Sequence, residues 1–485
     1  MNNFKVIIVG SGFGGQSAAI NLRKNGIEDF LILERRNFMG GTWCQNTYPG
    51  AAVDVQSLLY SLSFESYQWT RMFATQKELA AYTNHVIEKY ELKEKTILNT
   101  TVQSANWQSD EKRWEVILEN GSTYHAQFII NATGSLSTPT IPEFKGLEQF
   151  RGEFFHTNQW NHQYDYTNKK VAIIGSGASA IQVIPAIADA VDKLHVFQRT
   201  PHWILPKPDF KFPTFIQKLL SVKSVYKLAR YITYWALESR IIAFKYSKVA
   251  RNLIADKKAR RFIKKSFNNP EDRQKVTPDF TIGCKRILLS NNLYPTYLKA
   301  NVSLYTKEQA VDKITAHGIE TKDGQSIELD LIVFATGFAA DTSIVSYEVN
   351  GKNNQNLSQY WDQFPRAYLG TTVPNFPNFF IITGPNTGIG HTSAIFIIEA
   401  QINYIIDSIK EVENEKKDSI AVKMEAETAY TNMIHTEMER TVWATGGCKS
   451  WYHNKGGKVI ALFPGFSFSY YRLTKNFKKG NHIFE

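Results

Sequence analysis

The sequence begins with two short, almost wholly apolar runs, Phe4–Val9 and Phe30–Leu33, on either side of a stretch with helical periodicity, residues 16–24. Runs of this length and composition are typical of strands that are buried on both faces of a parallel sheet. Asn25-Gly26 ends the helical stretch, because this dipeptide favours a turn. The pattern predicts a β–α–β unit.

The turn between the first strand and the helix reads Gly10-Ser11-Gly12-Phe13-Gly14-Gly15. In a dinucleotide-binding turn, the first glycine makes the tight bend and the second lets the backbone approach a pyrophosphate. The third lets the helix pack closely on the strand. An acid at the end of the second strand can accept hydrogen bonds from a ribose, and Glu34 lies 24 positions after Gly10. We therefore expect an FAD site with Gly10, Gly12, Gly15 and Glu34 among its contacts.

A second unit of the same layout follows the apolar run Val171–Ile174 and reads Gly175-Ser176-Gly177-Ala178-Ser179-Ala180. Here the residue 24 positions after the first glycine is Arg199. A ribose hydroxyl prefers an acid, whereas a 2′-phosphate needs a cation with several donors. This unit predicts a site for NADPH in preference to NADH, with contacts from Gly175, Ser176, Gly177, Ser179, Arg199 and Thr200.

Two later apolar runs each end in Ala-Thr-Gly, at residues 132–134 and 335–337. Small residues at these ends let a strand pass close to a bound dinucleotide. Together the patterns predict an α/β fold of two dinucleotide-binding, Rossmann-like domains with a helical insertion in the NADPH domain. The expected division is an FAD domain of residues 1–145 and 373–485, an NADPH domain of residues 146–211 and 281–372, and an insertion of residues 212–280.

The insertion differs from its surroundings in composition. Residues 207–275 hold 18 Lys or Arg and 5 Asp or Glu, a local net charge of +13, whereas the whole chain carries +11. Apolar residues recur there at helical spacing, for example Phe215, Leu219, Val222 and Tyr226. Two interpretations stay open: a helical cap with solvated lysines, or peripheral contact of residues 212–270 with a membrane surface. The rest of the chain is nearly neutral, so we expect no nucleic-acid partner.

Composition and the number and spacing of the cysteines limit which class of protein this can be. A chain of 485 residues, 43% apolar and 21% charged, predicts a globular protein of several domains. No secretory signal and no apolar run long enough to span a membrane appears. The three cysteines, Cys44, Cys284 and Cys448, are far apart and suggest neither a disulfide framework nor a zinc site. We therefore expect a cytoplasmic protein without a metal.

Two longer motifs lie outside the nucleotide turns. One is Phe150-x-Gly152-xxx-His156-xxx-Trp160, and the other is Gly40-Gly41-Thr42-Trp43, four residues, Tyr48-Pro49-Gly50, three residues, Asp54. Both resemble motifs of the type I Baeyer–Villiger monooxygenases, which are class B flavoproteins that use FAD and NADPH. The resemblance extends over nearly the whole chain. It departs from the family pattern at Asn161, where Pro or Asp is usual.

The resemblance implies roles for further residues. Gly283-Cys284-Lys285-Arg286 matches the segment with the family's active-site arginine, so Arg286 takes this role and Asp54 is the carboxylate that holds it. Residues 446–452 resemble the loop that closes over nicotinamide and substrate. Cys284 and Cys448 are expected to be packing residues, and His156 to make a structural hydrogen bond. The cofactor contacts implied are Gly41, Thr42, Trp43, Asp54, Tyr60, Arg199, Lys285 and Trp451.

The chemistry of that family explains the need for an arginine. A flavin peroxide, made from reduced flavin and dioxygen, attacks a ketone to give an ester or a lactone. The attacking species is an anion, and an anion in a dry pocket is costly unless it is paired. Arg286 would stabilise this anion and the oxyanion of the adduct. Loss of one such donor typically costs roughly 2.7–4 kcal/mol of barrier, or ~10²–10³ in rate.

Three alternatives stay open beside an enzyme that oxidises small hydrophobic ketones or sulfides. A flavin-containing N- or S-oxygenase uses the protonated peroxide and would not need Arg286. An FAD- and NADPH-dependent electron-transfer reductase would need a redox partner or a dithiol, and the sequence holds no Cys-x-x-Cys. A basic protein that binds membranes or nucleic acid would leave both nucleotide turns unexplained.

Overall fold

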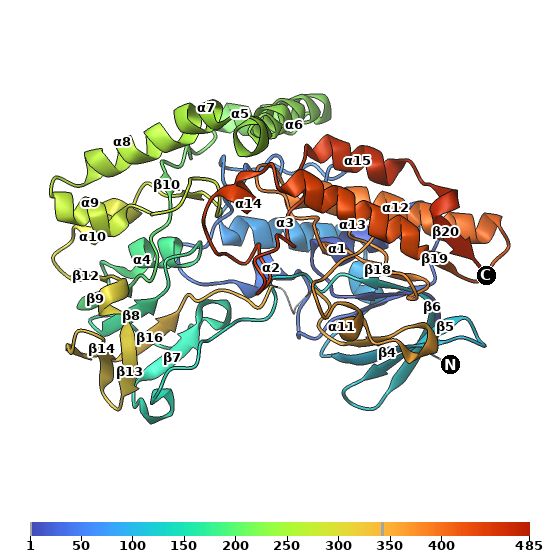
Figure 1. Ribbon diagram of the computed structural model, residues 1–485, viewed down its shortest axis with the longest axis horizontal. Coiled ribbons are helices and arrows are strands. Elements are labelled where there is room, and N and C mark those ends of the chain that lie inside the picture. The colour runs from blue at the N-terminus through green and yellow to red at the C-terminus, as the bar shows by residue number, and fades with distance from the viewer. Residues whose placement is uncertain (1, 341–343) are drawn as a thin grey trace.

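The N-terminal apolar runs form the centre of a first, mostly parallel sheet (Figure 1). The computed structural model describes residues 2–340 and 344–485. The N-terminal β–α–β unit is present, with α1 (Phe13–Lys24) between its two strands. In spatial order the strands are β17 (Glu348–Asn350), β4 (Val102–Gln108), β5 (Arg113–Leu118), β6 (Thr123–Asn131), β1 (Asn3–Val9), β2 (Phe30–Leu33) and β3 (Thr96–Ile97), and β18 (Phe379–Ile381) also pairs with β6.

Alternate side chains of β1 enter two different cores. Val6 and Ile8 pack with α1, α3 (Gln76–Lys89) and α12 (Ala394–Asn414), which cover one face of the sheet. Ile7 and Val9 pack on the other face, in a core that includes Trp114 of β5. The strand is therefore buried on both faces, and its run of apolar residues is continuous for this reason.

A second sheet contains the other nucleotide turn, and its five strands are all parallel. Their spatial order is β12 (Val302–Tyr305), β9 (Lys193–Phe197), β8 (Lys170–Ile174), β16 (Leu331–Phe334) and β7 (Glu153–His156). Helix α4 (Ala180–Ile187) follows β8 after the glycine turn. A small antiparallel sheet consists of β13 (Val311–Thr315), β14 (Gly318–Thr321) and β15 (Ser326–Glu328). The predicted fold class is confirmed.

One predicted boundary is wrong. Residues up to 372 were expected in the NADPH domain, but β17 pairs in parallel with β4 of the first sheet. Ile344 and Val349 are buried in the core of that sheet, and Asn131 Nδ2 donates to Ile344 O (2.9 Å). Apolar burial and backbone pairing therefore assign residues 344–372 to the first sheet. The sequence offers no local sign of this, because the partner strand lies more than 200 residues away.

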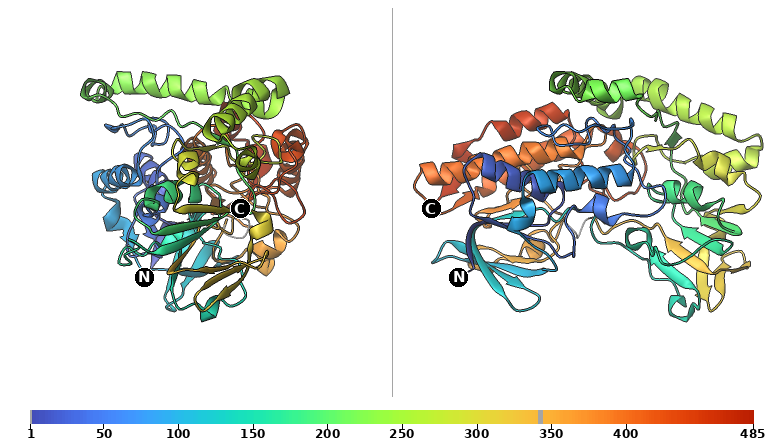
Figure 2. Two further views of the ribbon diagram at one scale, coloured as in Figure 1. Left: turned by 90° about the vertical axis from the view of Figure 1, so that its left-hand side faces the viewer. Right: turned by 180° about the vertical axis from the view of Figure 1, so that it is seen from behind.

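The helical insertion forms a layer along one side of the molecule (Figures 1 and 2). Its inner side contacts the first domain, where Tyr226 OH lies 3.0 Å from Ser61 Oγ and Arg230 Nη1 donates to Leu58 O (2.6 Å). In chain order the insertion contains α5 (Thr214–Leu220), α6 (Lys223–Glu238), the π-helical turn η4 (Ile242–Tyr246), α7 (Lys248–Arg251), the π-helical turn η5 (Asn252–Asp256), α8 (Lys257–Ser266) and α9 (Pro270–Val276).

The remaining elements connect and close the two sheets. Within residues 2–340 and 344–485, no helix has both the length and the hydropathy that a membrane crossing needs. The two termini lie at the same end of the molecule, beside the first sheet (Figure 1). Beside short 3-10 turns, the remaining elements of the described residues are α2 (Thr42–Gln45), β10 (Ile204–Leu205), β11 (Leu288–Leu289), α10 (Leu293–Tyr297), α11 (Leu357–Tyr360), β19 (Ile420–Val422), α13 (Met424–Met438), α14 (Val442–Thr445), α15 (Ser467–Lys475) and β20 (His482–Phe484).

Candidate active site

A large cavity, about 1070 Å³, runs between the two main sheets. Both glycine turns line it, as do both Ala-Thr-Gly segments and the loop at residues 449–452. Ligands of open α/β sheets bind outside the carboxyl ends of the strands, which is where this cavity lies. Of the predicted site residues, all but Gly15 line it: Gly10, Gly12, Glu34, Gly41, Thr42, Trp43, Asp54, Tyr60, Gly175, Ser176, Gly177, Ser179, Arg199, Thr200, Lys285, Arg286 and Trp451.

The first glycine turn is shaped by close backbone packing. Gly10 has φ +103°, and a Cβ there would lie 2.6 Å from Ala132 O. A Cβ at Gly15 would lie 1.9 Å from Gly10 O, so Gly15 allows the helix to approach the strand without contacting the cavity. Glu34 is buried and accepts hydrogen bonds from Ser11 N (3.0 Å) and Ser11 Oγ (2.6 Å). The turn and its acid fit the pyrophosphate and ribose of FAD.

The second turn repeats this packing. Gly175 has φ +133°, and a Cβ there would lie 2.3 Å from Ala335 O, the counterpart of Ala132. A Cβ at Gly177 would meet no atom within 4 Å, so this backbone is open to a phosphate. Ser176 Oγ donates to Thr200 O (2.7 Å) and ties the turn to the end of the next strand. The turn fits a second dinucleotide.

Two cations line the cavity beside the second turn. Burial and then the charge of Arg199 lower the pKa of Lys285. The pKa of His202 falls to about 4, first because of burial and then because of the Lys285 charge. Two cationic side chains held close together make this part of the cavity electropositive, which favours an anion. Arg199 and Lys285 therefore fit the 2′-phosphate that distinguishes NADPH from NADH.

Asp54 and Arg286 form a two-point ion pair on the cavity wall. Arg286 Nε donates to Asp54 Oδ2 (2.5 Å) and Nη2 donates to Asp54 Oδ1 (2.7 Å). Both side chains keep part of their surface exposed, 36% for Arg286 and 28% for Asp54, and this surface faces the cavity. Such geometry fixes the plane of the guanidinium as well as its position. Nη1 lies outside the pair and makes no hydrogen bond to any residue that the structure describes, so it can meet a ligand.

Each partner keeps the other charged. The Asp54 charge raises the pKa of Arg286 further above its ordinary value. Burial would raise the pKa of Asp54, but the charge and hydrogen bonds of Arg286, with a smaller effect of Lys207, outweigh burial and hold this pKa below its ordinary value. The pair therefore presents a fixed positive group to the cavity over the whole neutral pH range.

Comparisons with known proteins agree with this geometry. Residues 7–232 match the family model described as pyridine nucleotide-disulphide oxidoreductase. A Baeyer–Villiger monooxygenase of Pseudomonas aeruginosa is 44% identical over 98% of this chain and 90% of its own length. The chain belongs to the Baeyer–Villiger monooxygenase family. A cyclohexanone 1,2-monooxygenase of an Acinetobacter species is 30% identical over 100% of this chain and 96% of its own.

The solved structures extend the likeness to the whole fold. A steroid monooxygenase bound to NADP superposes with a TM-score of 0.90 at 28% identity and covers 99% of both chains. A cyclohexanone monooxygenase bound to ε-caprolactone superposes with a TM-score of 0.88 at 26% identity and covers 100% of both chains. The predicted family, fold and class of enzyme are confirmed.

In this member of the Baeyer–Villiger monooxygenase family, the segment Tyr48–Gly50 contacts α4 of the second domain. Tyr48 OH donates to Gln182 Oε1 (2.9 Å), and Gln182 Nε2 donates to Ala52 O (2.8 Å). A Cβ at Gly50 would lie 2.4 Å from Gln182 O. Sequence reasoning did not identify Gln182, which lies on α4. Gln182 lies three residues after Ser179 of the second turn, but nothing in that position identifies it from sequence. Only the contact in the folded chain does.

The motif around His156 and Trp160 is a buried junction. His156 Nδ1 accepts a hydrogen bond from Asn158 N (3.1 Å), as expected for a structural histidine, and burial lowers its pKa to about 4. Asn158 Nδ2 donates to Asn46 Oδ1 of the first domain (3.1 Å). Trp160 packs edge-on against Phe155, with ring centroids 5.0 Å apart. Neither His156 nor Trp160 lines the cavity; both pack within the second domain, and Asn158 makes the hydrogen bond to the first.

Lys207 lies next to the Asp54–Arg286 pair, and the sequence analysis did not identify it. Its Nζ donates to Val53 O (3.1 Å), next to Asp54. Burial lowers the pKa of Lys207, while the charges of Asp209 and Asp54 raise it. In the sequence it is one of many lysines in a basic segment, and no local pattern distinguishes it from the lysines that face solvent.

Two of the predicted cofactor contacts, Trp43 and Tyr60, also contact each other. Trp43 Nε1 donates a hydrogen bond to Tyr60 OH (3.0 Å), so each side chain helps to hold the other in place.

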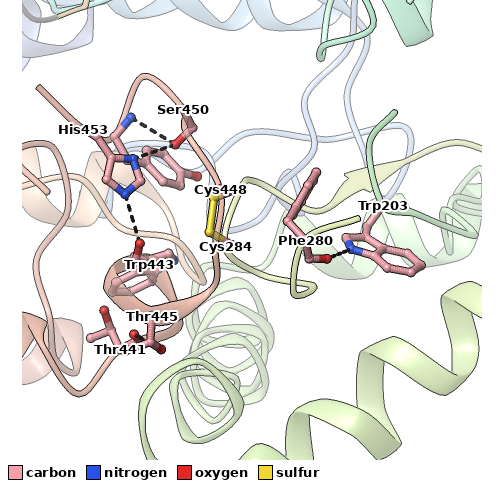
Figure 3. Close-up of a disulfide and its surroundings, with 10 residues drawn as sticks. Trp203, Phe280, Cys284, Thr441, Trp443, Thr445, Cys448, Ser450 and His453 are labelled. Carbon is pink, nitrogen blue, oxygen red and sulfur yellow. Dashed lines mark hydrogen bonds between the residues drawn. A yellow bond between two sulfur atoms is a disulfide. The ribbon is translucent and has the colours of Figure 1, made fainter. Parts of the chain in front are cut away.

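The cysteines require a correction. Cys284 and Cys448 were expected to be unpaired packing residues, but they form a disulfide across 164 residues of sequence (Figure 3). Only Cys44 is free in the part of the chain that the structure describes. A Cβ at Gly446 would lie 2.5 Å from Cys284 Cβ, so a glycine there permits the close approach. The argument for a reducing cytoplasm, which relied on unpaired cysteines, loses its support.

The disulfide ties the C-terminal loop to the Arg286 segment. Thr281 N donates to Gly446 O (3.0 Å), two residues before Cys448. In the loop, His453 Nε2 donates to Trp443 O (3.0 Å), as Figure 3 shows. Trp451 is 41% exposed at the cavity, whereas Tyr452 is buried beside the ion pair. The loop that lines the cavity is therefore anchored on both sides of Trp451.

Proposed function

We propose that this protein is an FAD- and NADPH-dependent monooxygenase that inserts one atom of dioxygen next to a ketone carbonyl to give an ester or a lactone. The observation that carries this proposal is the Asp54–Arg286 pair, which lies on the wall of the same cavity as two dinucleotide turns. Membership of the Baeyer–Villiger monooxygenase family supports the same reaction.

The residues present fit both cofactors. The turn at Gly10, with Glu34 at the next strand end, would hold FAD, and a relative from Aspergillus niger, 33% identical, is named an FAD-binding monooxygenase. The turn at Gly175, with Arg199 and Lys285, would hold NADPH. When bound, FAD that has been reduced by NADPH supplies the activated oxygen for the reaction.

Arg286 stabilises the charge that develops during oxygen addition. When oxygen adds to the carbonyl carbon of the ketone, negative charge develops on the carbonyl oxygen. Asp54 occupies Nε and Nη2 and leaves Nη1 to donate toward that charge. The guanidinium does not have to be reoriented or protonated during the reaction, because Asp54 fixes both its plane and its charge.

The C-terminal loop at residues 446–452 excludes water from the cavity. Trp451 lies at the cavity with its indole against Tyr452, at a centroid distance of 4.6 Å. The disulfide and the Thr281–Gly446 hydrogen bond hold the loop base next to the Arg286 segment. A closed, dry cavity strengthens the field of Arg286 and protects reactive oxygen from water.

Product analysis with a substrate panel tests the proposal. Purified protein with FAD is given NADPH, dioxygen and a set of linear, cyclic and aryl ketones, and esters are measured by gas chromatography. We expect ketone-dependent ester or lactone and an equivalent consumption of NADPH. If every ketone is returned unchanged while NADPH is consumed, the ketone assignment is wrong.

We also propose that small hydrophobic sulfides are oxidised in the same cavity. An apolar wall around Val55, Ile389 and Leu462 supports an apolar substrate. Sulfides added to the same assay should give sulfoxides, and a ketone should compete with them for the site. Sulfoxidation that no ketone inhibits would contradict a shared cavity.

We further propose a division of the chain that follows from these sites. The FAD domain comprises residues 1–145 and 344–485, and the NADPH domain comprises residues 146–211 and 281–340. The insertion of residues 212–280 then belongs to the NADPH domain by sequence. Its inner face contacts the FAD domain through Tyr226 and Arg230.

A further inference from the structure

The helical insertion turns many apolar side chains toward solvent. Three consecutive stretches each carry a stripe of such residues, and each of these side chains is between 43% and 69% exposed. We call them the outer face: Phe215 and Leu219 on α5 and Val222 just after it, then Leu228, Tyr231, Ile232 and Trp235 on α6, and then Ile242, Tyr246, Val249 and Leu253 from η4 to η5.

The spacing of these residues places them opposite the buried side of the layer. On α6 the buried positions Tyr226, Arg230 and Leu237 recur at intervals of four and seven, and they face the body of the molecule. The outer-face residues of α6 lie about half a turn away from them. A surface helix ordinarily presents polar residues on its outward side, so an outward apolar stripe indicates that something covers it.

Exposed lysines accompany the stripes. Lys218, Lys223, Lys227 and Lys248 are exposed on the helices that carry them, and Lys257 and Lys258 follow at the start of α8. Residues 207–275 have a net charge of +13, while the remainder of the chain is close to neutral. The helices that carry both kinds of group form the layer along one side of the molecule (Figures 1 and 2).

This chemistry matches an anionic lipid surface. Apolar side chains enter the boundary between headgroups and acyl chains, lysines meet anionic headgroups, and Trp and Tyr prefer the interface itself. Tyr231, Trp235 and Tyr246 supply such aromatic rings on the outer face. Because no helix of the described residues is long and apolar enough to cross a membrane, the helices would lie in the plane of the interface.

A second copy of the chain would suit this face less well. A two-fold contact through the outer face would bring the same patch against itself, and with it two segments of charge +13. We propose that the outer face of the insertion docks this protein on an anionic membrane. The proposal concerns a partner surface and does not depend on the reaction proposed above.

Vesicle flotation tests the proposal. The protein with its cofactors is mixed with phosphatidylcholine vesicles, with or without phosphatidylglycerol, and the bound fraction is measured after flotation. We expect binding to the anionic vesicles that weakens as salt is raised. The double variant Ile232→Asn/Leu253→Asn should lower the bound fraction at least tenfold. Both positions are exposed, so folding and the NADPH oxidation rate should not change.

Two control variants, Leu298→Asn and Lys77→Glu, change positions outside the insertion. Leu298 is 55% exposed, close to the 53% of Leu253, and lies after α10, so Leu298→Asn should bind vesicles like the parent. Lys223→Glu/Lys227→Glu should lose the preference for anionic vesicles, whereas Lys77→Glu on α3 should keep it.

Two outcomes overturn the proposal. One is that Leu298→Asn and Ile232→Asn/Leu253→Asn lower vesicle binding equally. The other is that the parent protein does not bind anionic vesicles at low salt. If light scattering then shows a dimer that Ile232→Asn/Leu253→Asn dissociates, the outer face is an interface between copies of this chain.

Discussion

At the scale of one residue, substitution of Arg286 should impair ester formation without impairing the binding of either cofactor. Arg286→Ala removes the donor that faces the developing charge, so ester formation should fall ~10²–10³-fold. NADPH oxidation and FAD content should stay near the parent values, because the nucleotide turns do not depend on this side chain. Ester and NADPH are measured in one reaction.

A conservative variant sharpens this test. Arg286→Lys keeps the charge but cannot make both hydrogen bonds to Asp54, so it should recover only part of the activity. If Arg286→Ala makes ester at the parent rate, Arg286 has no role in the chemistry.

The Asp54–Arg286 pair also predicts a pH dependence of stability. The pKa of Asp54 is held below its ordinary value of about 3.9, so its contribution is fully present above that pH. The contribution is lost only as pH falls through the lower, folded value. The pKa of Arg286 is raised, so the pair does not titrate between about pH 5 and pH 10.

The measurement compares the parent with Asp54→Asn. The difference in melting temperature between the two should be constant from pH 6 to pH 9 and should shrink below about pH 4. A difference that instead changes steeply near pH 7 would mean that the pair titrates there and would contradict the assignment.

Arg199 should determine the choice of nicotinamide cofactor. Charge-assisted hydrogen bonds contribute about 1.5–3 kcal/mol, so Arg199→Ala should raise the KM for NADPH roughly 10–100-fold. The KM for NADH, which lacks the 2′-phosphate, should change little and serves as the internal control. Steady-state kinetics give the KM for each cofactor. An equal rise in the KM for NADPH and for NADH would show that Arg199 does not contact the 2′-phosphate.

At the scale of an element, the disulfide should stabilise the C-terminal loop. It closes a loop of 164 residues, and disulfides typically contribute about 2–4 kcal/mol. Cys448→Ser should therefore lower the melting temperature by several degrees and raise the NADPH consumed per ester formed. Cys44→Ser, at the free cysteine, is the matched control and should change neither.

Thiol counting checks the bond itself. Denatured parent protein should expose one reactive thiol without reductant and three after reduction. Three reactive thiols in protein purified without reductant would contradict the bond.

The elements that the sequence predicts well are those whose pattern is local. The strand at Phe4–Val9, the turn at Gly10–Gly15 and the acid Glu34 lie within one β–α–β unit, and the second unit repeats them. The disulfide and the pairing of β17 with β4 join segments that are far apart. No periodicity records such contacts, so the unpaired-cysteine expectation and the boundary at residue 372 were wrong.

The same distinction applies to the site. Arg286 and Asp54 are 232 positions apart, and only the family resemblance linked them before the structure showed two hydrogen bonds between them. Lys207 and Gln182 belong to no motif and were not identified. Both act through backbone carbonyls near Asp54, and such contacts depend on the folded chain rather than on residue type.

At the scale of the whole molecule, the reaction requires two sheets that keep a fixed relation across one cavity. Gln182 on α4 of the second domain joins Tyr48 OH and Ala52 O of the first domain. A typical buried hydrogen bond contributes about 0.5–1.5 kcal/mol, so Tyr48→Phe and Gln182→Leu should each lower the ester formed per NADPH roughly 2–10-fold. FAD content should not change.

A double variant decides whether this contact acts as one unit. Tyr48→Phe/Gln182→Leu should be no worse than Gln182→Leu alone, because Gln182→Leu already removes the hydrogen bond from Tyr48 together with the one to Ala52 O. Tyr164→Phe is the matched control, since Tyr164 OH donates to Asp330 O (3.3 Å) within the second domain and should leave the ester yield unchanged. Additive losses in the double variant would show that Tyr48 and Gln182 act on the cavity separately, and the relation between the sheets would then rest on the Asn46–Asn158 junction.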